Sequence, residues 1–255
     1  MKKSMLALAA LLAVSAAPSF AQSAPASDWT ITGNAGLYSD YRFRGFSQTG
    51  YRPAFQGGFD VAHSSGFYVG NWNSNVEQGL YNGASLEMDF YGGYKGTAGP
   101  LGYDLGFIYY YYPNSGSGGT LKIKNGELYL GASYSVFSAK FYYATTEFFS
   151  IGKGVPGVDT KGSYYIDLNA NFDLGSGWGA VAHYGYQKIK DGRAAGLIDD
   201  TVGDYKLGVT KDLSGWVVGA SVIGTTEKNL FTTARSGFTE GAGKAKAVLS
   251  LSKTF

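Results

Sequence analysis

Apolar and polar residues alternate strictly along much of this sequence. The pattern is clearest in residues 163–174, and it recurs in residues 85–95 and 29–38. A period of two places successive side chains on opposite faces of a β-strand. No segment beyond residue 21 shows a convincing helical period. The pattern predicts twelve strands, over residues 29–41, 52–63, 66–75, 84–95, 101–112, 126–135, 138–149, 162–173, 177–190, 203–212, 215–226 and 243–255.

The connections between these strands alternate between long and short. The short ones are residues 64–65, 96–100, 136–137, 174–176 and 213–214, and the long ones are 42–51, 76–83, 113–125, 150–161, 191–202 and 227–242. Tight periplasmic turns, longer external loops and an even strand count are typical of an outer-membrane barrel. The sequence therefore predicts an all-β, closed, antiparallel up-and-down transmembrane β-barrel. Ten or fourteen strands remain as alternatives if a hairpin is merged or split.

The first 21 residues predict a cleaved signal peptide. Lys2 and Lys3 form a positive region, residues 5–17 are apolar, and Ser19 and Ala21 suit a signal-peptidase site. The apolar run is too short for a membrane-spanning helix, and no later segment has about 18 consecutive apolar residues. We expect cleavage after Ala21, which leaves residues 22–255 as a single barrel domain.

Composition excludes several classes of protein. The sequence has 21 Lys and Arg residues, so the loss of Lys2 and Lys3 leaves 19, against 19 Asp and Glu residues. A neutral chain offers no electrostatic basis for binding nucleic acid. The absence of cysteine excludes a disulfide scaffold, a Cys₄ zinc site and a thiol nucleophile. We expect neither a cofactor nor a metal ion.

Large aromatic residues recur where strands would rise from the periplasm. Aromatic rings are favoured at the membrane–water interface, so these residues predict an aromatic girdle. Its members are Trp29, Phe67, Tyr103, Trp178, Trp216 and Phe255. Leu249 and Leu251 share a strand face with the terminal Phe255, and this end resembles the signature by which outer-membrane barrels are recognised for assembly. Lys253 departs from that signature.

A spanning sheet must close, because each unpaired backbone group in hydrocarbon costs several kcal/mol. The charged face of each strand then surrounds a lumen, where inward tyrosines at 110, 129 and 142 would narrow a water-filled path. Inward glycines at 106, 131 and 208 would leave room or allow the strands to bend. We expect the lumen to be lined by Asp40, Arg42, Arg44, Asp60, Glu87, Asp89, Asp104, Glu127, Lys140 and Asp167, with Lys206 and Lys246 also inward.

Arg42 and Arg44 are expected to share one strand face, with Asp40 two residues earlier. At the outer mouth of a pore they would bias ion selection, as charged rings do. Alternatively, they would pin the first loop to the wall through ion pairs. The candidate partners are Asp60, Glu87 and Asp89. One cluster can serve both purposes, so both roles remain open.

Two other groups of residues allow a chemical and a structural interpretation. The carboxylates of Glu87 and Asp89 could hold Ca²⁺ or act as acid and base, but no Ca²⁺-loop spacing surrounds them, and a place on the lumen wall is favoured. His63 precedes two serines, whereas His183 lies on the inward face of its strand. A Ser–His hydrolase is disfavoured because adjacent strand residues point to opposite faces and a turn offers no oxyanion hole.

Residues 39–49, with the sequence SDYRFRGFSQT, resemble the opening signature of the TorF-type porins. Further segments similar to that family are residues 52–60, 66–76, 87–96, 110–113 and 250–255. The resemblance spans essentially the whole mature chain and is densest in its first half. It implies an outer-membrane β-barrel and a porin, but no particular solute and no catalytic residues.

The favoured function is a passive channel for ions or small hydrophilic solutes in the outer membrane of a Gram-negative bacterium. A plugged barrel that serves a structural or surface-interaction role is the alternative, and a barrel hydrolase is a distant third. Expected partners are outer-membrane lipid, lipopolysaccharide, the diffusing solute and the outer-membrane assembly machinery. Nucleic acid is not an expected partner, and the chain is expected to be a monomer.

Overall fold

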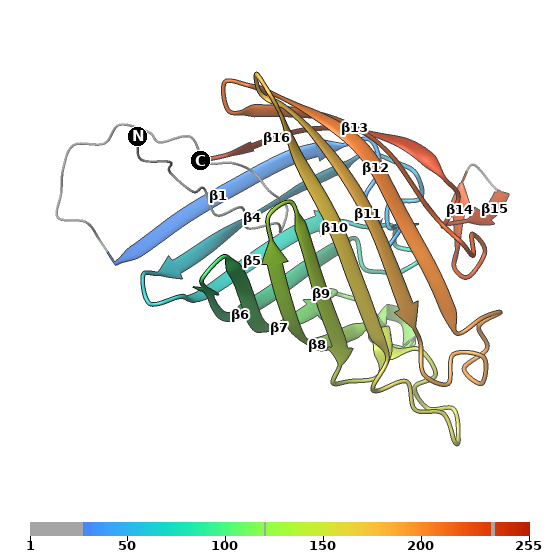
Figure 1. Ribbon diagram of the computed structural model, residues 1–255. Coiled ribbons are helices and arrows are strands. Elements are labelled where there is room, and N and C mark those ends of the chain that lie inside the picture. Colours follow the sequence, from blue (N-terminus) through green and yellow to red (C-terminus); the bar gives the residue numbers. More distant parts are fainter. Residues whose placement is uncertain (1–27, 120, 236–237) are drawn as a thin grey trace, which may run out of the picture.

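The computed structural model describes residues 28–119, 121–235 and 238–255 (Figure 1). Within these residues, twelve strands form a closed antiparallel barrel. The strands of the wall are β1 (Trp29–Tyr38), β4 (Ala54–His63), β5 (Phe67–Asn75), β6 (Leu86–Ala98), β7 (Leu101–Tyr111), β8 (Lys124–Tyr134), β9 (Phe137–Ala144), β10 (Tyr164–Gly175), β11 (Trp178–Lys188), β12 (Thr201–Leu213), β13 (Trp216–Thr225) and β16 (Lys246–Thr254). The predicted fold class is confirmed, whereas the predicted signal peptide lies outside the described residues.

Each wall strand pairs with the next one along the chain, and β1 closes the barrel by pairing with β16. In the closing pair, Leu37 lies opposite Leu251 and Asn34 lies opposite Thr254. Antiparallel strands can be joined directly by a turn or loop, so the wall strands follow one another around the barrel in the order of the sequence. Closure satisfies the hydrogen-bonding groups that a sheet edge would leave unpaired.

Short turns and long loops lie at opposite ends of the barrel, which we call the turn end and the loop end (Figure 1). Two of the turns, Ser176-Gly177 and Ser214-Gly215, have positive φ at both residues. A type I′ turn requires this backbone geometry, and its twist matches that of the flanking strands. The C-terminus lies at the turn end.

Four short strands and two 3₁₀ turns lie in the long loops. The hairpin of β2 (Arg42–Phe43) and β3 (Phe46–Ser47) belongs to the first loop, and that of β14 (Thr232–Arg235) and β15 (Phe238–Gly241) to the last. The 3₁₀ turns are η1 (Ser117–Gly119) and η2 (Phe148–Ser150). No helix in the described part of the chain is long and apolar enough to cross a membrane.

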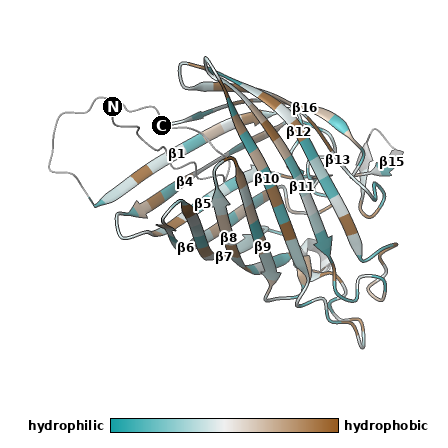
Figure 2. Cartoon of the chain, in the orientation of Figure 1, coloured by the Kyte–Doolittle hydropathy of each residue, from teal (hydrophilic) through white to brown (hydrophobic). Residues whose placement is uncertain are grey.

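The two faces of the wall differ in chemistry. Side chains that point away from the barrel are apolar and exposed, as in Ile31 at 70% and Leu207 at 64%. Inward side chains include Glu127, Lys140 and Asp167, which come from three neighbouring strands. Figure 2 shows the resulting alternation of hydropathy along the strands. The described residues therefore place apolar groups outside and charged groups inside, the reverse of a soluble β-protein.

The two halves of the lumen differ in accessibility. Near the loop end, inward side chains such as Tyr110 and Glu127 are buried beneath the loops. Nearer the turn end, Lys140, Asp104 and Asp167 keep 10%, 18% and 24% of their side-chain surface exposed. The lumen is thus narrowed at the loop end and accessible in its other half.

Candidate pore constriction

The first loop, residues 39–53, folds into the lumen through a tight hairpin. Arg44 and Gly45 form its two-residue turn and have φ values of 46° and 79°, with Phe43 opposite Phe46. The prediction that Arg42 and Arg44 share one strand face is wrong, because β1 ends at Tyr38 and Arg44 occupies the turn. The hairpin thus points the two arginines in different directions.

Arg44 reaches the side of the barrel opposite to β1. Its Nη2 donates to Glu127 Oε2 on β8 at 2.6 Å, and its Nη1 donates to Gln187 Oε1 on β11 at 2.5 Å. Its guanidinium also lies 4.3 Å from the ring centroid of Tyr165 on β10. Strands β8–β11 stand opposite β1 and β4 in the closed strand order. The first loop therefore crosses the full width of the lumen.

The contact between Arg44 and Glu127 is buried. The two side chains expose 7% and 0% of their surface. Burial opposes the charge on Arg44, but the attraction of Glu127 outweighs it and raises the pKa of the guanidinium above its ordinary value. The arginine thus stays charged and holds the hairpin tip against the wall.

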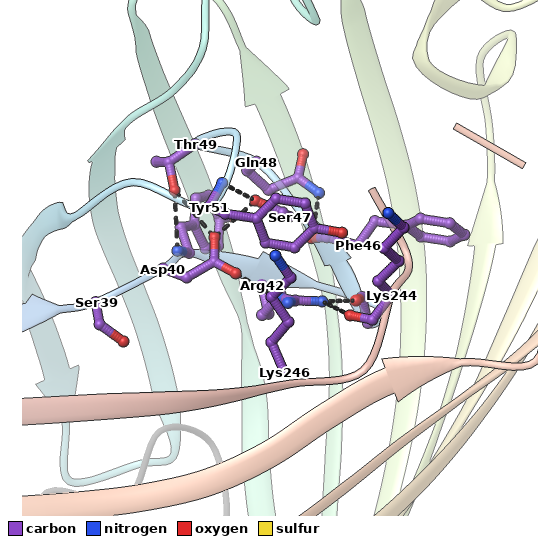
Figure 3. A network of polar contacts seen from close by, with 12 residues as sticks. Ser39, Asp40, Arg42, Phe46, Ser47, Gln48, Thr49, Tyr51, Lys244 and Lys246 are labelled. Atoms are coloured by element: carbon purple, nitrogen blue, oxygen red, sulfur yellow. Dashed lines mark hydrogen bonds and ion pairs between the residues drawn. The ribbon is translucent and has the colours of Figure 1, made fainter. Parts of the chain in front are cut away.

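Arg42 holds the base of the hairpin. Its Nε lies 2.5 Å from Asp40 Oδ2, and its Nη1 donates to the carbonyl oxygens of Gly45 and Lys244 at 2.8 and 3.0 Å. Figure 3 shows this network, in which Ser47 also donates to Asp40 Oδ1 at 2.6 Å. Lys244 lies in the last loop, so Arg42 joins the first loop to the last.

The expected partners of the two arginines are wrong. Asp40 and Glu127 take these places, while Asp60 accepts from Tyr91 Oη at 2.6 Å. Glu87 accepts from Tyr41 Oη in the first loop at 3.1 Å. Burial raises the pKa of Tyr41 well above its ordinary value, with a further contribution from Glu87, so the hydroxyl keeps the proton that it donates.

Three carboxylates lie buried around the first loop. Each of Glu87, Asp89 and Glu127 has one oxygen without a hydrogen-bond partner in the described part of the chain. Their strands, β6 and β8, are separated only by β7. Of these three carboxylates at the loop end of the lumen, Glu127 is the one that pairs with Arg44.

A second set of charges lines the accessible half of the lumen. Lys140 pairs with Asp104 at 2.8 Å, and Tyr68 Oη donates to the same aspartate at 2.5 Å. Asp104 lies on β7, the strand next to that of Glu87 and Asp89, but its ion pair lies further toward the turn end. His183 lies between two carboxylates, with Nδ1 at 3.1 Å from Asp167 and Nε2 at 2.8 Å from Asp204.

The expected girdle residues lie together on the outer face. Trp29, Phe67, Trp178, Trp216 and Phe255 are between 47% and 69% exposed, and Tyr103 is 37% exposed. All occupy the turn end of their strands or the C-terminus. Trp29 contacts the ring of His63, whose Nδ1 lies 2.7 Å from Ser65 Oγ on an exposed turn.

Comparison with known proteins identifies the family. A family model described as a bacterial protein of unknown function, Gcw_chp, matches residues 22–255. The chain belongs to the Gcw_chp family. A search of the curated proteins finds no match.

Two solved structures share the Gcw_chp barrel architecture. The NanC porin in a rhombohedral crystal form is 7% identical, with a TM-score of 0.56, and the alignment covers 89% of this chain and 99% of that chain. The KdgM porin in complex with disordered oligogalacturonate is 9% identical, with a TM-score of 0.53, and the alignment covers 88% and 98%. At these identities the likeness shows a common fold, that of the porins.

Sequence reasoning missed several partners in the constriction. Gln187 and Tyr165 bind Arg44, and the carbonyl oxygen of Lys244 binds Arg42. Alternation shows which face of a strand is inward, but it does not show which inward residues meet a loop that crosses the lumen. Gly45 is the one available signal, because glycine at the second position of a two-residue turn favours a tight hairpin.

Proposed function

We propose that this protein is an outer-membrane channel through which ions or small hydrophilic solutes diffuse passively. The observation that carries this proposal is the closed wall with an apolar exterior and a charged, partly accessible lumen. A wall of this kind shields water and polar solutes from hydrocarbon. The porin fold and the TorF-type resemblance support the same function.

The outer face supports a place in a membrane. Exposed apolar side chains encircle the barrel on every wall strand from β4 to β13, and they include Phe59, Leu130 and Val222. A soluble monomer rarely exposes apolar patches above a few hundred Å². The six aromatic residues at the turn end would lie at one membrane surface, with the short turns in the periplasm.

The first loop would set the size and charge of the path. In a channel, solutes would pass only between the side chains of this hairpin and the wall, so we expect small solutes to pass. The candidate selectivity residues are Asp40, Arg42, Arg44, Asp60, Glu87 and Asp89. The strands of the opposite half of the lumen would contribute Asp104, Glu127, Lys140 and Asp167.

A plugged barrel is the second candidate function. The buried contact between Arg44 and Glu127 favours it, because both side chains have little access to solvent. A loop held in this way closes the lumen unless it moves. In that case the barrel would present its external loops to lipopolysaccharide or to other partners at the cell surface.

Conductance through planar bilayers separates the two functions. Purified, refolded protein acting as a channel produces stepwise currents under an applied voltage. A variant in which residues 42–47 are replaced by a short Gly-Ser linker serves as the reference for an unobstructed lumen. Steps from the wild-type protein support the channel, whereas a silent wild type beside a conducting variant supports the plugged barrel.

The expected partners follow from this location. We propose that the assembly machinery of the outer membrane inserts the chain as a monomer, with lipid and lipopolysaccharide around it. Cross-linking of the protein in isolated outer membranes tests the monomer, because a discrete band at twice the monomer mass would contradict it.

A further inference from the structure

Lys206 is an inward-facing cation without a partner among the described residues. It takes part in no ion pair, hydrogen bond or ring contact there. The other lumenal cations have such contacts: Lys140 pairs with Asp104, Lys246 lies 3.9 Å from Glu240, and Lys95 lies 5.3 Å from the ring centroid of Tyr68. Three ammonium hydrogens of Lys206 are therefore available to a solute.

The hairpin tip lies beside the part of β12 that carries Lys206. A Cβ atom on Gly45 would lie 2.6 Å from Asp204 Cβ and 2.5 Å from Thr225 Cγ2, so the tip touches β12 and β13 directly. Lys206 is two residues from Asp204 toward the turn end, on the same face of β12. It therefore lies just below the constriction, at the border of the accessible half of the lumen.

Lys206 lies opposite His183 on β11 and Ile223 on β13, and smaller residues follow toward the turn end. Toward the turn end, β12 presents Gly208, which is paired with Ser221 on β13. Gly219 follows on β13 and is paired with Ser250 on β16. A Cβ atom on Gly208 or Gly219 would collide with Ser221 Oγ or Ser250 Oγ, so two serine hydroxyls line this sector of the wall.

The acidic groups that face Lys206 are already engaged. Asp204 accepts from Tyr165 Oη at 2.9 Å and contacts His183 Nε2. Asp167 contacts His183 Nδ1, and Asn169 donates to it at 2.6 Å. His183 thus contacts both nearby carboxylates, and among the described residues Lys206 forms an ion pair with neither.

We propose that Lys206 is an anion-binding residue that draws small solutes with a carboxylate or phosphate group to the inner side of the constriction. This inference rests on the proposed channel, and it gives the solute class. A fixed charge in a narrow, low-dielectric passage concentrates counter-ions near it. His183 can offset the charge of only one of the two nearby carboxylates, so Lys206 supplies the positive charge that a passing anion meets here.

Ion selectivity in planar bilayers tests the proposal. The reversal potential in a KCl gradient gives the ratio of chloride to potassium permeability for the wild type, Lys206→Gln, Lys206→Arg and Lys211→Gln. Lys211 is a matched control, because it lies on the same strand but outward, 5.1 Å from the ring centroid of Trp178. We expect Lys206→Gln to lower the ratio about threefold, as loss of one charge a few ångströms from the ion path predicts. Lys206→Arg and Lys211→Gln should keep the wild-type ratio.

Binding of inorganic phosphate to the detergent-solubilised protein gives a second readout that needs no current. Calorimetric titration should show binding to the wild type and to Lys211→Gln, and weakened binding to Lys206→Gln. An unchanged permeability ratio, or equal phosphate binding by Lys206→Gln, overturns the proposal. A silent wild type that still binds phosphate through Lys206 would refute the channel and leave the anion site standing.

Discussion

Arg44 Nη2 lies 2.6 Å from Glu127 Oε2, although 83 residues separate the two in sequence. One residue belongs to the turn of the first loop, and the other to a strand on the far side of the barrel. The ion pair is buried, so its geometry and its hydrogen bonds decide whether it is stable. This contact determines how far the first loop extends into the lumen.

Loss of the Arg44 side chain should release the hairpin tip. In Arg44→Ala, Glu127 remains as an unpaired buried carboxylate, which costs about 3–5 kcal/mol. The loop should leave the wall to relieve this cost, and single-channel conductance should rise. Arg193→Ala is the control, because Arg193 pairs with Asp199 on the surface at 3.2 Å, with 67% of its side chain exposed. Equal conductance in wild type and Arg44→Ala would show that the pair does not restrict the path.

Arg42 should influence ion selection at the same constriction. Arg42→Ala removes a guanidinium that contacts Asp40 and two carbonyl oxygens, so Asp40 becomes an uncompensated negative charge. We expect the channel to shift toward cations, as measured by the reversal potential in a salt gradient. Arg42→Lys should restore the charge but not the forked contacts. If Arg42→Ala keeps the wild-type selectivity, Arg42 has a purely structural role.

Gly45 should be required for the close approach of the hairpin to β12 and β13. A Cβ at this position would lie 2.8 Å from Gly224 O and closer still to two side chains. An alanine at this position would also have to adopt the positive φ of Gly45, which costs about 1–2 kcal/mol. Gly175→Ala has the same backbone strain at φ +80° but meets nothing within 4 Å, so it isolates the steric effect. We expect raised conductance in Gly45→Ala alone, and an equal response of both variants would contradict the packing of the tip.

A charge on the outer face should destabilise the barrel in lipid. Leu207 is outward and Thr210 is inward on β12. Leu207→Arg should lower the free energy of unfolding from lipid vesicles by about 2–4 kcal/mol, because arginine near the bilayer midplane is costly. Thr210→Arg should have a much smaller effect. Urea titration, followed by tryptophan fluorescence, measures the free energy of unfolding of both variants. Equal decreases in the two variants would be incompatible with a lipid-facing Leu207.

The wall of the barrel could be predicted from local sequence. Each of the twelve predicted strands has a counterpart in the wall, because alternation, turn residues and strand length act within a few residues of one another. The ends of strands were harder to predict: the first strand was expected to reach residue 41 but ends at Tyr38, where the first loop turns inward. Ser39 N instead bonds to Leu249 O on β16.

The constriction could not be predicted in the same way. Which inward residues meet across a lumen depends on the stagger between strands, and that stagger accumulates around the whole barrel. The partner of Arg44 therefore cannot be inferred from alternation, and neither can the fact that Lys206 has no partner among the described residues. The short β2–β3 hairpin lies largely within residues 42–51, where the pattern of alternation predicts only a connection between strands.

The most direct test of the account maps the environment of alternate residues along β12. The sequence has no cysteine, so single-cysteine variants at positions 205–210 can carry one spin label each in lipid vesicles. Electron paramagnetic resonance then compares relaxation by oxygen, which enters the hydrocarbon, with relaxation by a water-soluble nickel chelate. A wall with lipid outside and water inside predicts oxygen-accessible labels at positions 205, 207 and 209 and nickel-accessible labels at 206, 208 and 210. The opposite pattern, or no alternation, would contradict a barrel with lipid outside and water inside.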